Sequence, residues 1–265
     1  MADAAALRDH LRQLGRVVVA FSGGVDSALL TWAAVDALGS ERVLAATAVS
    51  PSLASSELAD CRAQAEAQGW RWQAVRTDEG ARPEYVANGL DRCYHCKSEL
   101  MERLQPLADA EEAIIVLGVN LDDLGDHRPG QEAARVHGAV FPLVDAGYTK
   151  ADVRAEARRV GLAVWDKPAA ACLSSRVPYG TPVTLGTLQQ VGDAEAALRA
   201  LGFREIRVRH YGDLARIELG PTELELAVER RARVVEAVHS AGYRYVTLDL
   251  EGLRSGNLNP TVAVR

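Results

Sequence analysis

The sequence has no long hydrophobic run, and this absence limits where the protein can work. Its longest apolar segments, such as residues 114–119, have the length of a strand, whereas crossing a bilayer takes ~20 apolar residues, so no membrane partner is expected. Residues 1–14 are charged and amphipathic, without the apolar core or the small-residue cleavage site of a secretory signal. These features predict a cytoplasmic protein.

An excess of basic residues is also missing. Lys and Arg number 30 against 36 Asp and Glu, which leaves a net charge of −6. A polyanion such as tRNA, or any other nucleic acid, is therefore not an expected partner. A small anionic ligand could still bind through local arginines. Internal repeats and low-complexity tracts are absent as well.

What is present in the first half is an alternation of β-rich and helical runs, the pattern of a parallel sheet covered by helices. The strands are predicted at residues 16–21, 43–49, 70–76 and 113–119, and the helices at residues 28–38, 56–68, around Cys93, and 150–160. Thr149 is the expected N-cap of the last helix and Gly161 its end. The chain has 265 residues, 48% of them hydrophobic, enough for a large α/β domain and a small second unit.

The amino-acid composition changes after Cys172. Residues 177–182, Val-Pro-Tyr-Gly-Thr-Pro, are too rich in proline and glycine to continue a helix. The order beyond them is a helix at 185–201, strands at 205–209 and 215–219, a helix at 223–241 and a strand at 244–248. We therefore predict an α/β domain at residues 1–180 and a small α+β domain at residues 181–265.

The strongest motif follows the first predicted strand. A buried-strand pattern runs directly into a segment of glycines and serines and then into a helix, whose N-terminus presents unpaired N–H groups to an anion. This context favours a phosphate or pyrophosphate site over an ordinary glycine turn. The segment is neither a Walker loop nor a dinucleotide-binding turn. It reads Ser22-Gly23-Gly24-Val25-Asp26-Ser27.

An acidic side chain inside an anion cradle predicts a cation, so we expect Asp26 to share Mg²⁺ with the phosphates. Two later strands end where α/β sheets bind nucleotides, at their carboxyl ends. An ordinary strand end would explain these residues about equally well. The candidates at these ends are Ala48, Ser50, Gly118 and Asn120.

Cys93 and Cys96 form a Cys-x-x-Cys pair, and Cys172 lies downstream. In a reducing cytoplasm such cysteines indicate metal binding or chemistry rather than disulfides. A redox dithiol, half of a zinc site, part of an iron–sulfur cluster and plain buried packing are all open interpretations. The lack of a second pair weakens zinc, while three thiolates can hold a 4Fe-4S cluster with one iron open. Cys61, mid-helix among alanines, is expected to be packing.

The loop is similar to the Ser-Gly-Gly-x-Asp-Ser signature of the PP-loop ATP-pyrophosphatases, which cleave ATP to AMP and pyrophosphate and adenylate a substrate oxygen. More narrowly, almost the whole chain resembles the LarE family of ATP-dependent sulfur transferases. The resemblance implies a PP-loop domain with the adenine nucleotide alpha hydrolase-like fold, and a small C-terminal domain for substrate binding or oligomerisation. It rests on four segments: Arg92-Cys93-Tyr94-His95-Cys96-Lys97, residues 118–130, Lys167-Pro168 with Cys172-Leu173-Ser174-Ser175-Arg176, and residues 254–259.

The LarE resemblance implies that ATP and Mg²⁺ adenylate a carboxylate of pyridinium-3,5-biscarboxylic acid mononucleotide, which becomes a thiocarboxylate during biosynthesis of the nickel-pincer nucleotide cofactor. Two sulfur sources occur in this family. In one, a single cysteine at the position of Cys172 gives up its own sulfur; in the other, three cysteines hold a 4Fe-4S cluster that carries a sulfide. Because Cys93 and Cys96 accompany Cys172, we expect the cluster type, with an external sulfur donor. The resemblance also implies a homo-oligomeric assembly.

An anionic mononucleotide calls for arginines that make bidentate contacts. Arg207 and Arg209 stand two apart on a predicted strand and so project from one face, and the resembled family uses a matching pair. Arg176, beside the cysteine, is a further candidate for the substrate and Arg128 for the nucleotide. Solvent exposure is the competing explanation for each arginine. For Glu195, on the preceding helix, we expect a solvated helix face, and a place near the arginine pair is the alternative.

Three other functions remain open. A tRNA thiolase would use the same loop and cysteines on a uridine, but no basic RNA-binding module is evident. An ammonia-using adenylating synthetase would need no set of three cysteines. A zinc-holding nucleotide sensor would bind ATP without releasing pyrophosphate.

Overall fold

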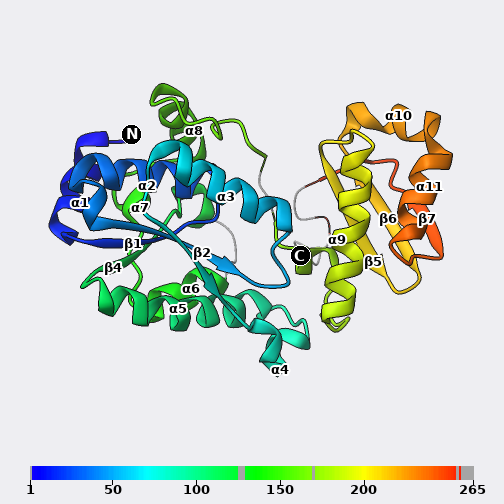
Figure 1. Ribbon diagram of the computed structural model, residues 1–265, viewed down its shortest axis with the longest axis horizontal. Coiled ribbons are helices and arrows are strands. Elements are labelled where there is room, and N and C mark those ends of the chain that lie inside the picture. The colour runs from blue at the N-terminus through cyan, green and yellow to red at the C-terminus, as the bar shows by residue number, and fades with distance from the viewer. Residues whose placement is uncertain (1, 125–128, 169–170, 255–256, 258–265) are drawn as a thin grey trace, which may run out of the picture. The chain divides into compact units, whose positions relative to one another are not determined.

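The computed structural model describes residues 2–124, 129–168, 171–254 and 257, and the chain forms two compact units (Figure 1). The first unit comprises Met1–Arg82 and Asp91–Ala170, and the second comprises Pro83–Leu90 and Ala171–Arg265. The chain thus enters the second unit at Pro83, returns to the first unit at Asp91, and enters the second unit again at Ala171. The functional division at residue 180 stays a prediction.

A parallel four-stranded sheet forms the centre of the first unit and confirms the α/β class. The strand order is β3 (Trp72–Arg76), β2 (Val43–Val49), β1 (Val17–Ala20), β4 (Ile114–Leu117). Because β1 pairs with β2 on one side and β4 on the other, the strand order reverses beside β1. Such a switch point opens a crevice at the carboxyl end of the strand.

Helices cover both faces of this sheet (Figure 1), which explains the unbroken valine run of β1. Val17 and Val19 belong to the hydrophobic core under α1 (Ala4–Leu14), α2 (Val25–Leu38), α3 (Ser55–Gln68) and α8 (Lys150–Arg159). Val18 belongs to the opposite core, under α5 (Arg92–Ala110) and α6 (Pro129–Val136). The remaining short elements of this unit are η1 (Ser40–Arg42), η2 (Glu79–Ala81), η3 (Leu121–Leu124) and α7 (Pro142–Asp145).

The start of two helices decides where side chains of the site lie. In α8, Thr149 is the N-cap as predicted: its hydroxyl accepts from the Asp152 N–H, and the Asp152 carboxylate accepts from the Thr149 N–H at 3.0 Å. This cap fixes the first helical residue, Lys150. The helix after the glycine loop begins at Val25 rather than at Ala28, so the last loop residues already belong to the first turn of α2.

The second unit contains a mixed three-stranded sheet, in which β5 (Ile206–Tyr211) is antiparallel to β6 (Leu214–Leu219) and β6 is parallel to β7 (Tyr245–Leu248). Ile206 and Val208 point into a core with α9 (Leu185–Ala200) and α11 (Arg231–Ser240). Since side chains alternate along a strand, Arg207 and Arg209 lie on the other face. The unit also contains η4 (Leu173–Arg176) and η5 (Pro221–Glu223).

The single helix predicted at residues 223–241 is wrong. The structure has α10 (Leu224–Glu229) and α11, separated at Arg230, whose φ of −94° and ψ of 18° interrupt the helix. Neither glycine nor proline marks this break in the sequence. A tertiary contact accompanies it, because the Arg230 Nη1 donates to the Leu201 carbonyl at 2.8 Å.

A short segment containing α4 (Pro83–Val86) belongs to the second unit although the first unit surrounds it in sequence. The Tyr85 hydroxyl shares a hydrogen bond with the Ser174 hydroxyl. The buried Asn88 amide donates to the Pro178 and Thr181 carbonyls, both at 2.8 Å. This segment therefore braces the proline-rich stretch that follows Cys172.

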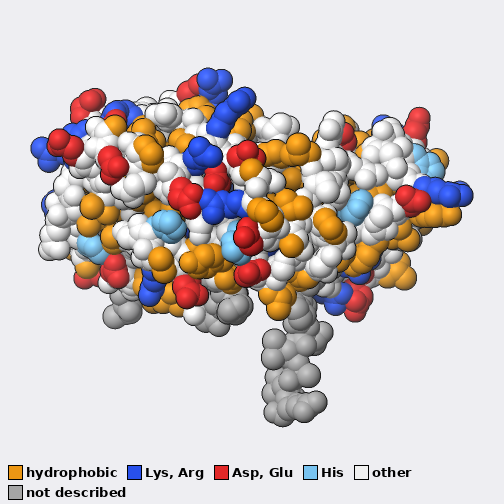
Figure 2. Space-filling view, turned by 90° about the horizontal axis from the view of Figure 1, so that it is seen from below, with side chains coloured by type: hydrophobic (Ala, Val, Ile, Leu, Met, Phe, Trp, Pro, Cys, Tyr) orange, Lys and Arg blue, Asp and Glu red, His pale blue; other side chains and the backbone are white. Residues whose placement is uncertain are grey.

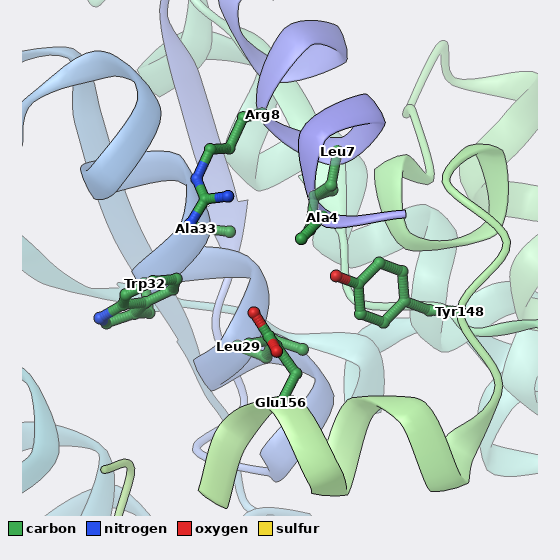
Figure 3. Close-up of a pocket in the computed structure, with 8 residues that line it drawn as sticks. All are labelled: Ala4, Leu7, Arg8, Leu29, Trp32, Ala33, Tyr148 and Glu156. Carbon is green, nitrogen blue, oxygen red and sulfur yellow. The ribbon is translucent and has the colours of Figure 1, made fainter. Parts of the chain in front are cut away.

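A small recess lies between α1, α2 and α8 in the first unit (Figure 3). Apolar side chains such as Leu7 and Leu29 line it, and the Tyr148 hydroxyl and the Glu156 carboxylate reach its edge. None of its lining residues belongs to the glycine loop, the predicted strand ends or the cysteines. Among the described residues, no helix combines the length and hydropathy needed to span a bilayer.

Candidate functional site

The glycine loop is held closed by its own hydroxyl groups. The Ser27 hydroxyl donates to the Gly24 carbonyl at 3.0 Å and lies 3.2 Å from the Ser22 N–H, which donates to it. Gly23 has a φ of +71°, and a Cβ there would lie 2.7 Å from the Cys61 sulfur, so both conformation and space require glycine. Val25 is buried in the core, so its contribution to a ligand is confined to its backbone.

Gly118, at the end of β4, is in close contact with this loop. A Cβ at Gly118 would lie 2.7 Å from the Ser27 nitrogen and 2.8 Å from the Asp26 carbonyl carbon. Backbone atoms cannot move aside as a flexible side chain can. Glycine at this strand end therefore allows β4 to touch the first turn of α2, and the structure brings these two predicted site segments together.

Asp26 has two partners inside the first unit. Its Oδ1 accepts from the Asn120 amide at 2.9 Å, and its Oδ2 forms an ion pair with Lys150. The Asn120 side chain is itself oriented by the N–H groups of Asp122 and Asp123, which donate to its Oδ1. Lys150 was not among the predicted residues, because the sequence places it in a separate helix far from the loop.

The Asp26 ion pair changes the argument for a cation. The sequence suggested that an acidic residue in an anion cradle needs Mg²⁺, whereas the structure supplies an ammonium group from Lys150. Asp26 as a Mg²⁺ ligand stays a prediction.

The end of β2 leads into a chain of hydroxyl groups. Ser50 and Ser52 share a hydrogen bond of 2.8 Å, and the Ser52 hydroxyl donates to the buried carboxylate of Glu79 at 2.6 Å. Ala48 lies near the end of β2 and is half-buried. Glu79 was missed because it lies outside any recognisable motif. Arg128 lies outside the described residues.

The cysteines are divided between the two units, and none of the four is in a disulfide. Cys93 is exposed and Cys96 half-buried, both near the start of α5, whereas Cys172 is exposed and lies at the N-cap of η4. Cys61 is fully buried, and burial raises the pKa of its thiol, as expected for packing. Among the described residues no group of three or more His, Cys, Asp or Glu is placed to hold a metal ion.

Arg176 and Glu195 form a buried ion pair, so the solvated helix face expected for Glu195 is wrong. Glu195 is 3% exposed, and its carboxylate accepts from the Arg176 Nε at 2.8 Å and Nη2 at 3.1 Å. The Arg176 Nη1 donates to the carbonyls of Ala171 and Cys172 at 2.8 and 3.2 Å. Helical periodicity could not show that this face of α9 meets an arginine from another element.

Arg207 and Arg209 share a face of β5 as predicted, yet their surroundings differ. Arg209 is 3% exposed and pairs with the fully buried Glu218 at 2.8 Å, while its Nη1 donates to the Ser175 carbonyl at 2.8 Å. Arg207 is half-buried and donates to the Arg254 carbonyl at 3.1 Å. Burial lowers the pKa of Arg207, and the neighbouring Arg176 and Arg209 lower it further.

On the face drawn in Figure 2, Lys and Arg side chains lie among Asp and Glu side chains. The side chains coloured there gather into no broad basic patch.

A parallel sheet whose switch point opens onto a Ser-Gly-Gly-Val-Asp-Ser loop and a helix N-terminus defines an ATP-using enzyme of the PP-loop class. Residues 4–81, which contain that loop, match the family model described as NAD synthase. The chain is also 40% identical over 259 residues to the pyridinium-3,5-bisthiocarboxylic acid mononucleotide synthase of Lactiplantibacillus plantarum, covering 97% of this chain and 94% of that protein. It therefore belongs to the LarE family, which confirms the resemblance seen in its motifs.

Two further relatives extend over most of the chain. An uncharacterised protein of Synechocystis is 48% identical over 256 residues, covering 96% of this chain and 95% of the relative. An uncharacterised protein of Methanocaldococcus jannaschii is 25% identical over 241 residues, covering 91% of each. Both alignments include the two units rather than the loop region alone.

Proposed function

We propose that this protein adenylates a carboxylate of pyridinium-3,5-biscarboxylic acid mononucleotide and converts it to a thiocarboxylate, in the biosynthesis of the nickel-pincer nucleotide cofactor. The observation that carries the proposal is the 40% identity, along nearly the whole chain, to a synthase named for the bisthiocarboxylic product. The closed glycine loop, the half-buried Arg207 and the accessible thiols each fit one part of that reaction.

The first step forms an acyl-adenylate. A carboxylate oxygen attacks the α-phosphorus of ATP, and the bond to pyrophosphate breaks. The N–H groups at the start of α2 and the Ser22 hydroxyl would hold the departing pyrophosphate. Lys150, which pairs with Asp26, would help to neutralise the charge of the pyrophosphate. A Mg²⁺ ion held by Asp26 would supply further screening of that charge. Asp26 is half-buried and already lies at the loop, so its carboxylate suits such an ion.

The substrate anion is best matched by Arg207. Among the described residues it forms no ion pair, although it is half-buried beside two other arginines. Leaving a guanidinium unpaired in such a place is costly. Burial, and after it the neighbouring Arg176 and Arg209, lower the pKa of Arg207, and a bound phosphate or carboxylate would stabilise its charged form. Arg209 and Arg176 are paired with buried glutamates, so their guanidinium groups are less available than that of Arg207 for direct contact with a substrate anion.

The second step transfers sulfur. A sulfur nucleophile held at Cys93, Cys96 and Cys172 forms a bond to the acyl carbon, and AMP leaves with the original carboxylate oxygen and its bonding electrons. Accessible thiols are the donor type that iron–sulfur clusters use, and a bound 4Fe-4S cluster would supply an open iron for a sulfide. The segment Pro83–Leu90, which precedes Cys93 in the chain by a few residues, is hydrogen-bonded to the Cys172 region.

Repeated turnover by this route would need an external sulfur donor and a reducing cytoplasm. We therefore propose that such a donor supplies the sulfur and that the protein works in the cytoplasm. Homo-oligomeric assembly is the remaining part of the proposal, and size-exclusion chromatography with light scattering tests it directly.

The direct test is a reaction with ATP, Mg²⁺ and the pyridinium mononucleotide, followed by pyrophosphate and by mass spectrometry of the product. We expect pyrophosphate release that depends on the mononucleotide and a thiocarboxylate product. Formation of an amide when ammonium is added would instead support an ammonia-using synthetase, and pyrophosphate release driven by tRNA would support a thiolase. Absence of pyrophosphate with every acceptor would contradict adenylation.

Anaerobic reconstitution with iron and sulfide separates the two sulfur sources. A cluster absorption band that disappears in each of the Cys93→Ser, Cys96→Ser and Cys172→Ser variants would support a cluster bound by all three. An iron-free protein that thiolates once, with Cys172 converted to dehydroalanine by mass spectrometry, would support the sacrificial route.

A further inference from the structure

The backbone around Cys172 is held far more tightly than its exposed side chain suggests. The Cys172 carbonyl accepts from three donors: the Ser175 N–H at 3.0 Å, the Ser175 hydroxyl at 2.8 Å and the Arg176 Nη1 at 3.2 Å. The same Nη1 also donates to the Ala171 carbonyl at 2.8 Å. The thiol itself remains accessible. The loop thus presents an exposed thiol on a main chain that hydrogen bonds hold in place.

Arg176 is committed to this framework. It is 6% exposed, and each of its three side-chain nitrogens donates to an acceptor within the second unit. Its charge is balanced by Glu195, which is equally buried. A substrate anion that bound Arg176 directly would have to displace Glu195, and it would leave that carboxylate buried without a partner.

Glu195 extends the connection to the strand of the substrate arginines. Its Oε1 accepts from the Arg176 Nε at 2.8 Å and also from the Val208 N–H at 3.0 Å. Val208 lies in β5 between Arg207 and Arg209. A second link runs parallel, because Arg209 donates to the Ser175 carbonyl while Glu218 holds its guanidinium. Two glutamate–arginine pairs therefore join the cysteine loop to β5.

We infer that Arg176 is a positioning residue, which fixes the Cys172 main chain relative to the anion site at Arg207 and does not itself bind substrate. This inference rests on the proposed function, in which sulfur must reach the acyl carbon of a substrate anchored at Arg207. Reactive groups must be held near 3–3.5 Å apart and aligned, and a misplacement of about 1 Å can cost ~100-fold in rate. Direct substrate binding by Arg176, expected from the sequence, is replaced by this role.

The test compares Arg176→Lys with Arg207→Gln, and uses Arg199→Gln, an exposed arginine on α9, as the matched control. For Arg176→Lys we expect thiocarboxylate formation to fall by about 10- to 100-fold, with pyrophosphate release and the KM for the mononucleotide within about twofold of the parent protein. For Arg207→Gln we expect the reverse, a raised KM in both steps. Arg199→Gln should change neither.

A readout that needs no substrate separates this inference from the proposed function. In Arg176→Lys, the amide hydrogens of residues 173–176 should exchange faster, and iodoacetamide should alkylate Cys172 at a changed rate, while unfolding temperature stays near that of Arg199→Gln. If Arg176→Lys does not fold, the paired variant Arg176→Gln/Glu195→Gln replaces it, since two amides leave no buried charge unmatched.

Two results would overturn the inference. One is a raised KM with an unchanged thiolation rate in Arg176→Lys, which would show direct substrate contact. The other is unchanged exchange and unchanged alkylation of the cysteine loop. If the parent protein makes no thiocarboxylate at all, the proposed function fails, and the exchange and alkylation results still decide whether Arg176 positions the loop.

Discussion

The glycine loop of the first unit consists of backbone atoms and small side chains. The arginine face of the second unit, formed by Arg176, Arg207 and Arg209, consists of long charged side chains, two of which pair with buried glutamates. The loop depends on conformation and space: Gly23 and Gly118 leave no room for a Cβ. The arginine face depends on charge pairing: Glu195 and Glu218 hold Arg176 and Arg209, whereas Arg207 forms no ion pair with any residue that the structure describes. The comparison indicates that steric fit determines the structure of the glycine loop, whereas charge pairing determines the structure of the arginine face.

The largest effect is expected at the cysteine that the second unit presents. Cys172→Ser should reduce thiocarboxylate formation by at least ~10³-fold, because it removes the atom or ligand that the transfer requires. Pyrophosphate release, which the proposed function assigns to the first unit's loop, should stay within about twofold in a single-turnover assay. Cys61→Ala is the control, because this buried thiol packs next to Gly23 and is not one of the three proposed sulfur-binding cysteines. An equal loss of both steps in Cys172→Ser would contradict the assignment of pyrophosphate release and sulfur transfer to different units.

Gly118→Ala tests whether sterics govern the loop. The new methyl would meet backbone atoms of Asp26 and Ser27 at 2.7 to 2.9 Å, and overpacking of this kind costs about 1–3 kcal/mol. We expect a matching fall in unfolding free energy by urea titration and a loss of pyrophosphate release. Gly80→Ala, where the nearest atom outside the chain neighbours is a side-chain oxygen at 3.8 Å, should be close to neutral. A fully active Gly118→Ala enzyme would remove the steric account.

Lys150→Gln asks whether charge also matters in the first unit. Loss of a cation that stabilises departing pyrophosphate is expected to reduce pyrophosphate release by about 10²-fold, as for other preorganised donors in active sites. Lys150→Arg should recover part of this rate, and isothermal titration should show weaker ATP binding for the Gln variant. If Lys150→Gln leaves both quantities unchanged, the Asp26–Lys150 pair serves stability alone.

The smallest effect concerns pH and the core of the second unit. His210 is buried, and burial lowers its pKa below the ordinary value; its Nδ1 lies 3.1 Å from the Tyr243 hydroxyl. The unfolded chain therefore binds the proton more readily than the folded one, so stability should decrease as the pH falls below the unfolded pKa of about 6.5. Urea midpoints between pH 5 and pH 7.5 measure this dependence. His210→Gln should flatten it.

Much of the first unit could be predicted from sequence because its features are local. The valine run, the glycine loop and the Thr149 N-cap each occupy consecutive residues whose types have strong conformational preferences. Periodicity also placed Arg207 and Arg209 on one face of β5. The start of α2 was set too late, because Asp26 and Ser27 belong to the motif and to the first helical turn at once.

The remainder depended on contacts between distant elements. Lys150 reaches Asp26 across 124 positions in the chain, and Glu195 meets Arg176 from a different helix. No spacing rule connects such pairs, since the fold alone brings them together. For the same reason the sequence could not distinguish an arginine that is neutralised by a glutamate from one that is available to an anion.

The small segment Pro83–Leu90 has a practical consequence for anyone who divides this protein. A fragment beginning at Ala171 would lack Tyr85 and Asn88, and with them the bonds to Ser174, Pro178 and Thr181. The second unit is discontinuous, so truncation removes part of its interior. To restore the missing hydrogen bonds, residues 83–90 would have to be supplied as a separate peptide or joined to the fragment through a short linker.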